Sequence, residues 1–284
     1  MTTTRATMLG RAVLVGCAAI AIASLATVLV ALPGGAPTSA DPGAPAVAWW
    51  IVLLPAVVGI ALALALPRRA VAMPAIVTDA RRLRASTAVL LACAVALPVL
   101  SGTLSLAGGE GYVLAKVALV MLVPGLAVAV LGGVRIHRAR GAWRWWAPAI
   151  VVVAWTLLSQ VAPWNPVHDL SGVDPVLLVV AASATAVTAG LGEELLFRCW
   201  LQTRLEAALG AWPGIALASL AFALMHLGSH ATGAPVLDVA RVVVAQGSFG
   251  LLMGVLWWRH RNLVAIVAAH VVSNGWAVAA HLLG

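Results

Sequence analysis

The decisive stretch is Val180-Ala-Ala-Ser-Ala-Thr-Ala-Val-Thr-Ala-Gly-Leu-Gly-Glu-Glu-Leu-Leu-Phe-Arg198, which sets two adjacent carboxylates inside a run that reads as membrane-embedded. The whole chain of 284 residues has only 9 acidic residues, and Glu193 and Glu194 are neighbours. A carboxylate at membrane depth is costly unless it is paired or lines a polar cavity. Two neighbouring carboxylates cost more, because like charges resist ionising together. We therefore expect the pair to have both partners and a use.

The composition around this stretch is that of a membrane protein. Hydrophobic residues make up 63% of the chain and charged residues 9%, and the mean hydropathy is +1.04. A soluble domain has about half apolar and about a quarter charged residues. The formal charge of +8 could suggest nucleic acid, but the basic residues cluster in short segments between apolar runs, where they face anionic lipid headgroups. The chain is predicted to bind the lipid bilayer and no nucleic acid.

Apolar runs of roughly 20 residues predict an all-α polytopic membrane protein with about eight to nine transmembrane helices. The sixth run is too long for one perpendicular crossing, so it must tilt, kink or extend into the interface. The nine candidate spans lie near Ala12–Leu32, Ala46–Leu66, Ala85–Ala107, Tyr112–Leu131, Trp145–Pro163, Pro175–Arg204, Ala211–Leu227, Val239–Trp258 and Leu263–Leu283.

The distribution of basic residues predicts the orientation. With the N-terminus in the cytoplasm, every basic residue except Lys116 and Arg241 falls in an inside segment, as the positive-inside rule requires. Nine spans would then place the C-terminus outside. The Arg-, Ala- and Val-rich composition suggests a bacterial cytoplasmic membrane. We interpret Ala12–Leu32 as a retained transmembrane helix, and cleavage near Ala40 is the alternative.

Embedded polar side chains gather towards the C-terminal end of the chain. Residues 1–174 form a predicted N-terminal transmembrane region of about five helices with few embedded polar groups and unknown function. Residues 175–284 hold nearly all the candidates for chemistry, which are Glu193, Glu194, Arg198, His226, His270 and Asn274. We predict a domain boundary between these two ranges.

Helical spacing brings some of these side chains together. Glu194 and Arg198 are four residues apart and can pair on one helix face, which would leave Glu193 pointing about 100° away and free. His270 and Asn274 share a face in the same way. If Arg204, Trp212 and Arg261 mark the inner membrane surface, a rise of about 1.5 Å per residue puts Glu193, His226, His270 and Asn274 at depths of roughly 14–21 Å. Three helices would then place these polar side chains at a similar depth in the membrane.

A carboxylate and two imidazoles at one depth can support hydrolysis in two ways. Glu and His can together deprotonate a water, and a carboxamide such as Asn274 can hold the developing oxyanion. Two His and one Glu are also a catalytic zinc set, here Glu193, His226 and His270. Each residue alone has a simpler interpretation, since a buried His is often a packing residue and a Glu–Arg pair is often structural. The combination of these residues at one depth in the membrane favours a shared functional site.

Three ordered motifs carry a family resemblance. The segments Glu193-Glu194-Leu-Leu-Phe-Arg198, Phe222-Ala-Leu-Met-His226 and His270-Val-Val-Ser-Asn274 resemble the EExxxR, FxxxH and HxxxN motifs of the CPBP family of intramembrane proteases (type II CAAX prenyl endopeptidases, bacteriocin-processing and Abi proteins). The resemblance covers about residues 175–280 and implies a CPBP-type helical core. Cys199 departs from the glycine that usually follows the Arg.

The resemblance also implies roles for the matched positions. Glu193 and His226 would activate the water, while His270 and Asn274 would complete the site and stabilise the oxyanion. Glu194 and Arg198 would be structural or position the substrate, and Phe222 would support His226. The motifs leave open whether such a site holds Zn²⁺ or works by Glu and His alone.

The leading hypothesis is a membrane-embedded endopeptidase that cleaves a membrane-associated protein or peptide near the membrane surface. A non-catalytic immunity, scaffold or signalling protein that keeps the motifs as a polar core is the main alternative. An ion-coupled transporter using the same carboxylates is the third, although no inverted repeat supports it. The sequence does not identify the substrate.

Overall fold

The computed structural model describes residues 3–37, 45–67, 75–103, 109–135, 143–167, 169–230 and 232–283. The alternative cleavage site near Ala40 lies outside these residues. The elements, with π-helical segments labelled η, are α1 (Thr3–Ala31), β1 (Ala36–Pro37), β2 (Ala46–Val47), α2 (Trp49–Ala65), β3 (Ile76–Val77), α3 (Ala80–Thr103), α4 (Gly109–Val117), η1 (Ala118–Leu122), α5 (Val123–Leu131), β4 (Val134–Arg135), α6 (Trp143–Thr156), η2 (Leu157–Val161), α7 (Pro175–Thr185), η3 (Ala186–Gln202), α8 (Thr203–Leu209), α9 (Ala211–Met225), α10 (Leu227–His230), α11 (Pro235–His260) and α12 (Leu263–Leu283).

The predicted all-α polytopic fold is confirmed. Within the described ranges, 7 helices are long and apolar enough to cross a membrane, and two shorter apolar helices cover Trp49–Ala65 and Trp145–Val161. These nine helices match the nine predicted segments in order, and seven of them have the full length of a span. The sixth segment is one continuous helix of 35 residues, Pro175–Leu209, as its length in the sequence predicted. Only two short antiparallel strand pairs, β1–β2 and β3–β4, join the described loops.

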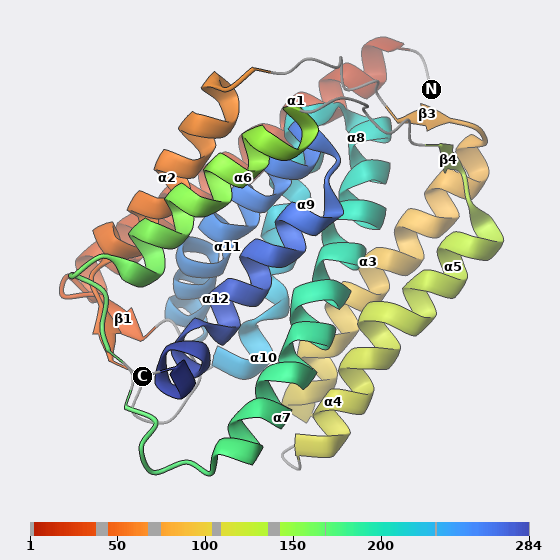
Figure 1. Ribbon diagram of the computed structural model, residues 1–284. Coiled ribbons are helices and arrows are strands. Elements are labelled where there is room, and N and C mark those ends of the chain that lie inside the picture. The colour runs from red at the N-terminus through yellow and green to blue at the C-terminus, as the bar shows by residue number, and fades with distance from the viewer. Residues whose placement is uncertain are drawn as a thin grey trace.

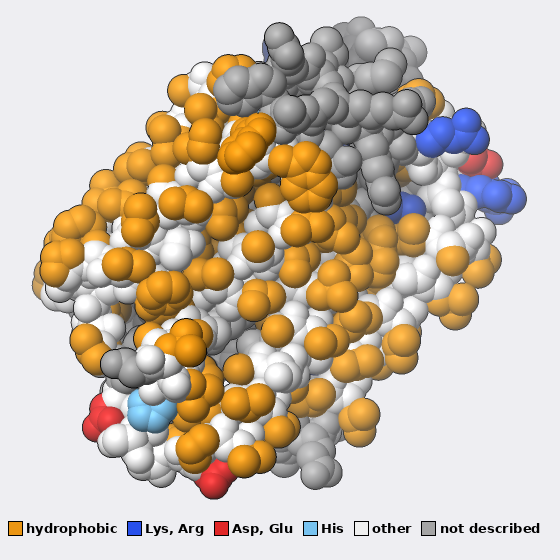
Figure 2. All heavy atoms as spheres, viewed as in Figure 1, with side chains coloured by type: hydrophobic (Ala, Val, Ile, Leu, Met, Phe, Trp, Pro, Cys, Tyr) orange, Lys and Arg blue, Asp and Glu red, His pale blue; other side chains and the backbone are white. Residues whose placement is uncertain are grey.

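The helices form one bundle with the two chain termini at opposite ends (Figure 1). This arrangement agrees with an odd number of crossings. In Figure 2 the visible face is largely apolar, Lys and Arg side chains gather at the end near β3 and β4, and acidic side chains and a His lie at the end near the C-terminus. The orientation with the N-terminus inside stays a prediction, and the gathering of Lys and Arg side chains at one end is what it requires.

The N-terminal helices share their core with the C-terminal ones. Leu90 and Leu97 of α3 pack in one cluster with Phe197 of η3 and Phe222 of α9. A second cluster joins residues of α2 and α6 to residues of α11 and α12. The N-terminal region therefore forms one wall of the bundle that surrounds the three motifs, and the boundary at residue 174 stays a prediction from sequence.

Local sequence signals explain where the long sixth helix begins. Asp174 caps α7 by accepting hydrogen bonds from the backbone N–H of Val176 at 2.8 Å and of Leu177 at 3.1 Å. Pro175 occupies the first turn, where its missing N–H costs nothing. The helix then loosens from α7 into η3, so that Glu193 and Glu194 lie on a π-helical segment of 17 residues. π-helical segments are rare and often mark functional sites.

The charged residues taken as inner-surface markers are buried. The Arg204 guanidinium donates to Ser86 Oγ at 2.8 Å and to the Gly132 carbonyl at 2.9 Å. Arg261, whose φ of 46° is left-handed, pairs with Glu206 beneath the turn between α11 and α12. Both arginines therefore join elements of the bundle to each other, and their use as markers of the inner membrane surface stays a prediction.

The contact between α8 and α9 depends on Gly214. A Cβ at this position would lie 2.5 Å from the backbone nitrogen of Glu206, whereas a Cβ at Gly16 of α1 would meet nothing within 4 Å. We expect Gly214→Ala to lower the free energy of unfolding by about 1–3 kcal/mol, as overpacking against a fixed backbone does. Thermal unfolding in detergent measures this loss. Gly16→Ala is the control, and equal stability of the two variants would contradict the packing.

Candidate active site

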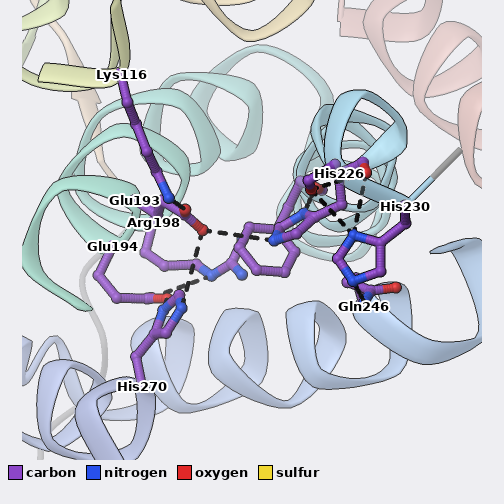
Figure 3. Close-up of polar contacts among 10 residues, drawn as sticks. Lys116, Glu193, Glu194, Arg198, His226, His230, Gln246 and His270 are labelled. Atoms are coloured by element: carbon purple, nitrogen blue, oxygen red, sulfur yellow. Dashed lines mark hydrogen bonds and ion pairs between the residues drawn. The ribbon is translucent and has the colours of Figure 1, made fainter. Parts of the chain in front are cut away.

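Three separate helices bring the predicted polar side chains together. Glu193 and Glu194 come from η3, His226 follows the last turn of α9, and His270 comes from α12. Glu193 Oε2 lies 3.9 Å from His226 Nε2 and 3.8 Å from His270 Nε2. Figure 3 shows the two imidazoles approaching this carboxylate from different sides. The predicted meeting of Glu193, His226 and His270 is therefore present in the structure.

Glu193 has a partner that the sequence analysis did not assign. Lys116 Nζ of α4 lies 2.6 Å from Glu193 Oε1 (Figure 3). The Glu193 side chain is 1% exposed and that of Lys116 is 12% exposed. Glu193 is thus not the free carboxylate of the pair. Lys116 is the only lysine of the chain, and its position as an exception to the charge pattern was the available signal.

Glu194 contacts two partners, Arg198 and His270. The i,i+4 spacing predicted the first of these contacts. Arg198 Nε lies 3.4 Å from Glu194 Oε2, and both side chains are fully buried. The other carboxylate oxygen, Oε1, lies 2.7 Å from His270 Nδ1. Because a carboxylate accepts, this contact places a proton on Nδ1 of His270. Glu194 therefore orients His270 while Arg198 balances its charge.

His226 is oriented by its own helix. Its Nδ1 lies 2.8 Å from the Phe222 carbonyl, and since a carbonyl can only accept, Nδ1 carries the proton. The neutral imidazoles of both His226 and His270 then present unprotonated Nε2 atoms to Glu193. Glu193 Oε2 has no hydrogen-bond donor among the described residues. Three acceptors thus face one point at separations that suit a shared donor such as water.

Aromatic rings form the apolar wall of this cluster. The Phe222 ring lies 4.8 Å from the His226 ring and 6.0 Å from the His270 ring between centroids. The Arg198 guanidinium stacks 4.6 Å from the centre of the same Phe222 ring, a favourable cation–π arrangement. Phe249 closes the other side of His270 at 5.2 Å. The FxxxH spacing therefore supplies both a carbonyl for His226 and a ring that packs against the site.

Two further candidates lie at the margin of the cluster. Asn274 follows His270 by one turn on α12, and its side chain is exposed. Within the described residues it has no contact with Glu193, so its oxyanion role stays a prediction. His230 lies on the short helix α10, with its ring centroid 5.9 Å from that of His226 and its Nδ1 3.0 Å from Ser229 Oγ.

The side chains as placed do not form a zinc site. Ligand atoms bound at about 2.0–2.1 Å in a tetrahedral arrangement lie about 3.4 Å apart, whereas the two carboxylate–imidazole separations are 3.8 and 3.9 Å. The Lys116 ammonium on the same carboxylate opposes a second cation. No group of three or more His, Cys, Asp or Glu in the described parts of the chain is placed to hold a metal ion. The zinc interpretation stays an untested prediction.

The comparison with protein families bears on the same segment. Residues 175–276 match the family model for Rce1-like type II CAAX prenyl endopeptidases. This Rce1-like segment contains all three motifs, and the match confirms the resemblance to CPBP proteins. The Rce1-like family is a protease family, so the match supports an endopeptidase in general. Neither a curated protein nor a solved structure matches the chain.

The buried ion pair of the Rce1-like segment makes a testable contribution to stability. Arg198→Met would leave the Glu194 carboxylate without its cation in a dry interior, and removal of one partner of a buried pair costs about 3–5 kcal/mol. We expect a corresponding loss in thermal unfolding experiments. The double variant Arg198→Met/Glu194→Gln should be more stable than Arg198→Met alone, because the unpaired charge is then removed. A double variant whose loss of unfolding free energy equals the sum of the losses in Arg198→Met and Glu194→Gln would contradict the pairing.

Proposed function

We propose that the protein is a membrane-embedded endopeptidase that hydrolyses a peptide bond near the membrane surface with a water activated by Glu193 and His226. The observation that carries this proposal is the convergence of Glu193 Oε2 with the Nε2 atoms of His226 and His270, at 3.9 and 3.8 Å. A water held there can donate to Glu193 Oε2 and to one of the imidazole nitrogens and turn a lone pair towards a substrate. The Rce1-like match supports the reaction class.

The first chemical step uses Glu193 as the general base. The water oxygen forms a bond to the carbonyl carbon of the substrate, its proton passes to Glu193 Oε2, and the carbonyl π electrons move to oxygen. The tetrahedral intermediate then collapses as the carbon–nitrogen bond breaks. The same proton passes to the departing nitrogen, so that Glu193 is again a carboxylate and the products are an acid and an amine.

The oxyanion of this intermediate needs donors. The neutral imidazole of His270 has no N–H on Nε2 to donate, because its proton lies on Nδ1, which donates to Glu194 Oε1 at 2.7 Å. We assign Asn274 to the oxyanion, with its exposed carboxamide reaching a bound substrate, while His270 completes the site beside Glu193. Glu194 and Arg198 hold this side of the site in place.

Access supports cleavage near a surface. The His226 side chain is 18% exposed, and the side chains of Glu193 and His270 are at most 5% exposed. His226 directly precedes α10, which lies towards the same end of the bundle as the C-terminus (Figure 1). A substrate would reach the carboxylate past His226. A membrane-associated protein or peptide fits this route, and prenylated CAAX proteins are the substrates that the family description suggests.

Substitution of the three central residues tests the function. In proteoliposomes with a library of membrane-anchored fluorogenic peptides, we expect Glu193→Gln, His226→Ala and His270→Ala each to lower the cleavage rate at least about 100-fold, because each removes a group needed in the transition state. Asp79→Asn, an exposed carboxylate at the start of α3, is the matched control. Cleavage at the wild-type rate by Glu193→Gln would contradict the proposal, and a wild type that cleaves no peptide would favour the non-catalytic alternative.

Removal of metal ions separates the two hydrolytic chemistries. After exhaustive dialysis against a strong chelator, we expect the wild-type cleavage rate to change less than about twofold, because Glu193 and His226 suffice as base and orienting group. The metal content of the dialysed protein is measured alongside. Loss of cleavage that is restored specifically by Zn²⁺ would instead support the zinc set of Glu193, His226 and His270.

A further inference from the structure

Lys116 reaches the site from outside the Rce1-like segment. It lies one residue before the end of α4, in the N-terminal region whose role the sequence left open. In Figure 3 its side chain extends from a different ribbon to the carboxylate that the two imidazoles face. The contact of 2.6 Å joins Nζ to Glu193 Oε1, so the ammonium occupies one carboxylate oxygen and leaves the other to the imidazoles.

The segments η1 and η3 pack closely against each other. η1 begins two residues after Lys116 and lies against η3. A Cβ at Gly192, the residue before Glu193, would lie 3.0 Å from Met121 Cγ and 3.3 Å from Val120 Cγ1. The absence of a side chain at Gly192 therefore lets η1 approach the helix that carries the carboxylates. Tyr112, one turn before Lys116, places its ring 5.9 Å from Nζ and limits where the ammonium can go.

Charge balance gives Lys116 a reason to be there. Among the described side chains of the cluster, the acids are Glu193 and Glu194 and the permanent cations are Lys116 and Arg198. Arg198 is engaged with Glu194 through its Nε, so Glu193 depends on Lys116 for its nearest opposite charge. In a medium of low dielectric constant, a carboxylate keeps its charge only beside such a partner.

We propose that Lys116 is a positioning residue of the hydrolytic site, which keeps Glu193 ionised and turns its Oε2 towards His226 and His270. This inference rests on the proposed function and extends it to the N-terminal region. The ammonium touches neither imidazole in the described contacts and takes up no proton in the reaction. It acts on the substrate only through Glu193, whose orientation and charge decide whether the water is activated.

The test compares Lys116→Met, Lys116→Arg and the control Arg241→Met in proteoliposomes with the fastest-cleaved peptide of the library. Arg241 is the other basic residue that departs from the charge pattern, and it lies 3.7 Å from Asp238, away from the cluster. We expect Lys116→Met to lower kcat about 100-fold, as misplacement of a reacting group does, with KM within about twofold. Lys116→Arg should regain at least about a tenth of the wild-type kcat, because it keeps the charge.

Infrared difference spectroscopy tests the same inference without turnover. The difference between wild type and Glu193→Gln should contain a carboxylate stretch, whereas the difference between Lys116→Met and Lys116→Met/Glu193→Gln should contain the carbonyl stretch of a protonated acid. A purely structural lysine would not change the band of Glu193. A Lys116→Met variant with the carboxylate band and a kcat within about twofold of wild type would overturn the inference. If the wild type cleaves nothing, the proposed function fails and the infrared bands alone decide the role of Lys116.

Discussion

The fold depends on the neutralisation of two adjacent carboxylates in an apolar interior. Each carboxylate has its own cation: Lys116 from α4 for Glu193 and Arg198 from the next turn for Glu194. The Lys116–Glu193 pair forms only where α4 lies against η3, and the contact of Glu194 with His270 Nδ1 joins η3 to α12. These two contacts therefore fix the positions of α4 and α12 relative to η3. Such pairs add little net stability beyond what apolar side chains would give. They are better understood as a means of holding charge where water is scarce.

The same arrangement separates the roles of the two neighbouring acids. Both carboxylate oxygens of Glu194 are engaged, Oε2 with Arg198 and Oε1 with Nδ1 of His270. Glu193 gives one oxygen to Lys116 and keeps the other beside the two Nε2 atoms. One acid therefore orients and the other reacts. The asymmetry follows from the helix, since consecutive residues point in different directions, and from the partner that each direction meets.

The sequence predicted the parts of this site that have local spacing or a motif. The apolar runs predicted the helices, the i,i+4 spacing predicted the contact of Glu194 with Arg198, and the three motifs predicted that His226 and His270 approach Glu193. It did not predict the π-helical form of η3, because no residue pattern distinguishes an i→i+5 ladder from an α-helix in an apolar run. It also missed Lys116, since a contact across 77 residues of sequence, from 116 to 193, leaves no periodic signal.

The central claim is that a water activated by Glu193 attacks the peptide bond directly. A single turnover in H₂¹⁸O, with enzyme in excess over the fastest-cleaved peptide and mass spectrometry of the product, measures this most directly. The account predicts one ¹⁸O atom in the new carboxylate of the product and no product from Glu193→Gln. An unlabelled product from the first turnover would show that an enzyme group, and not water, attacks the carbonyl, and would contradict the account.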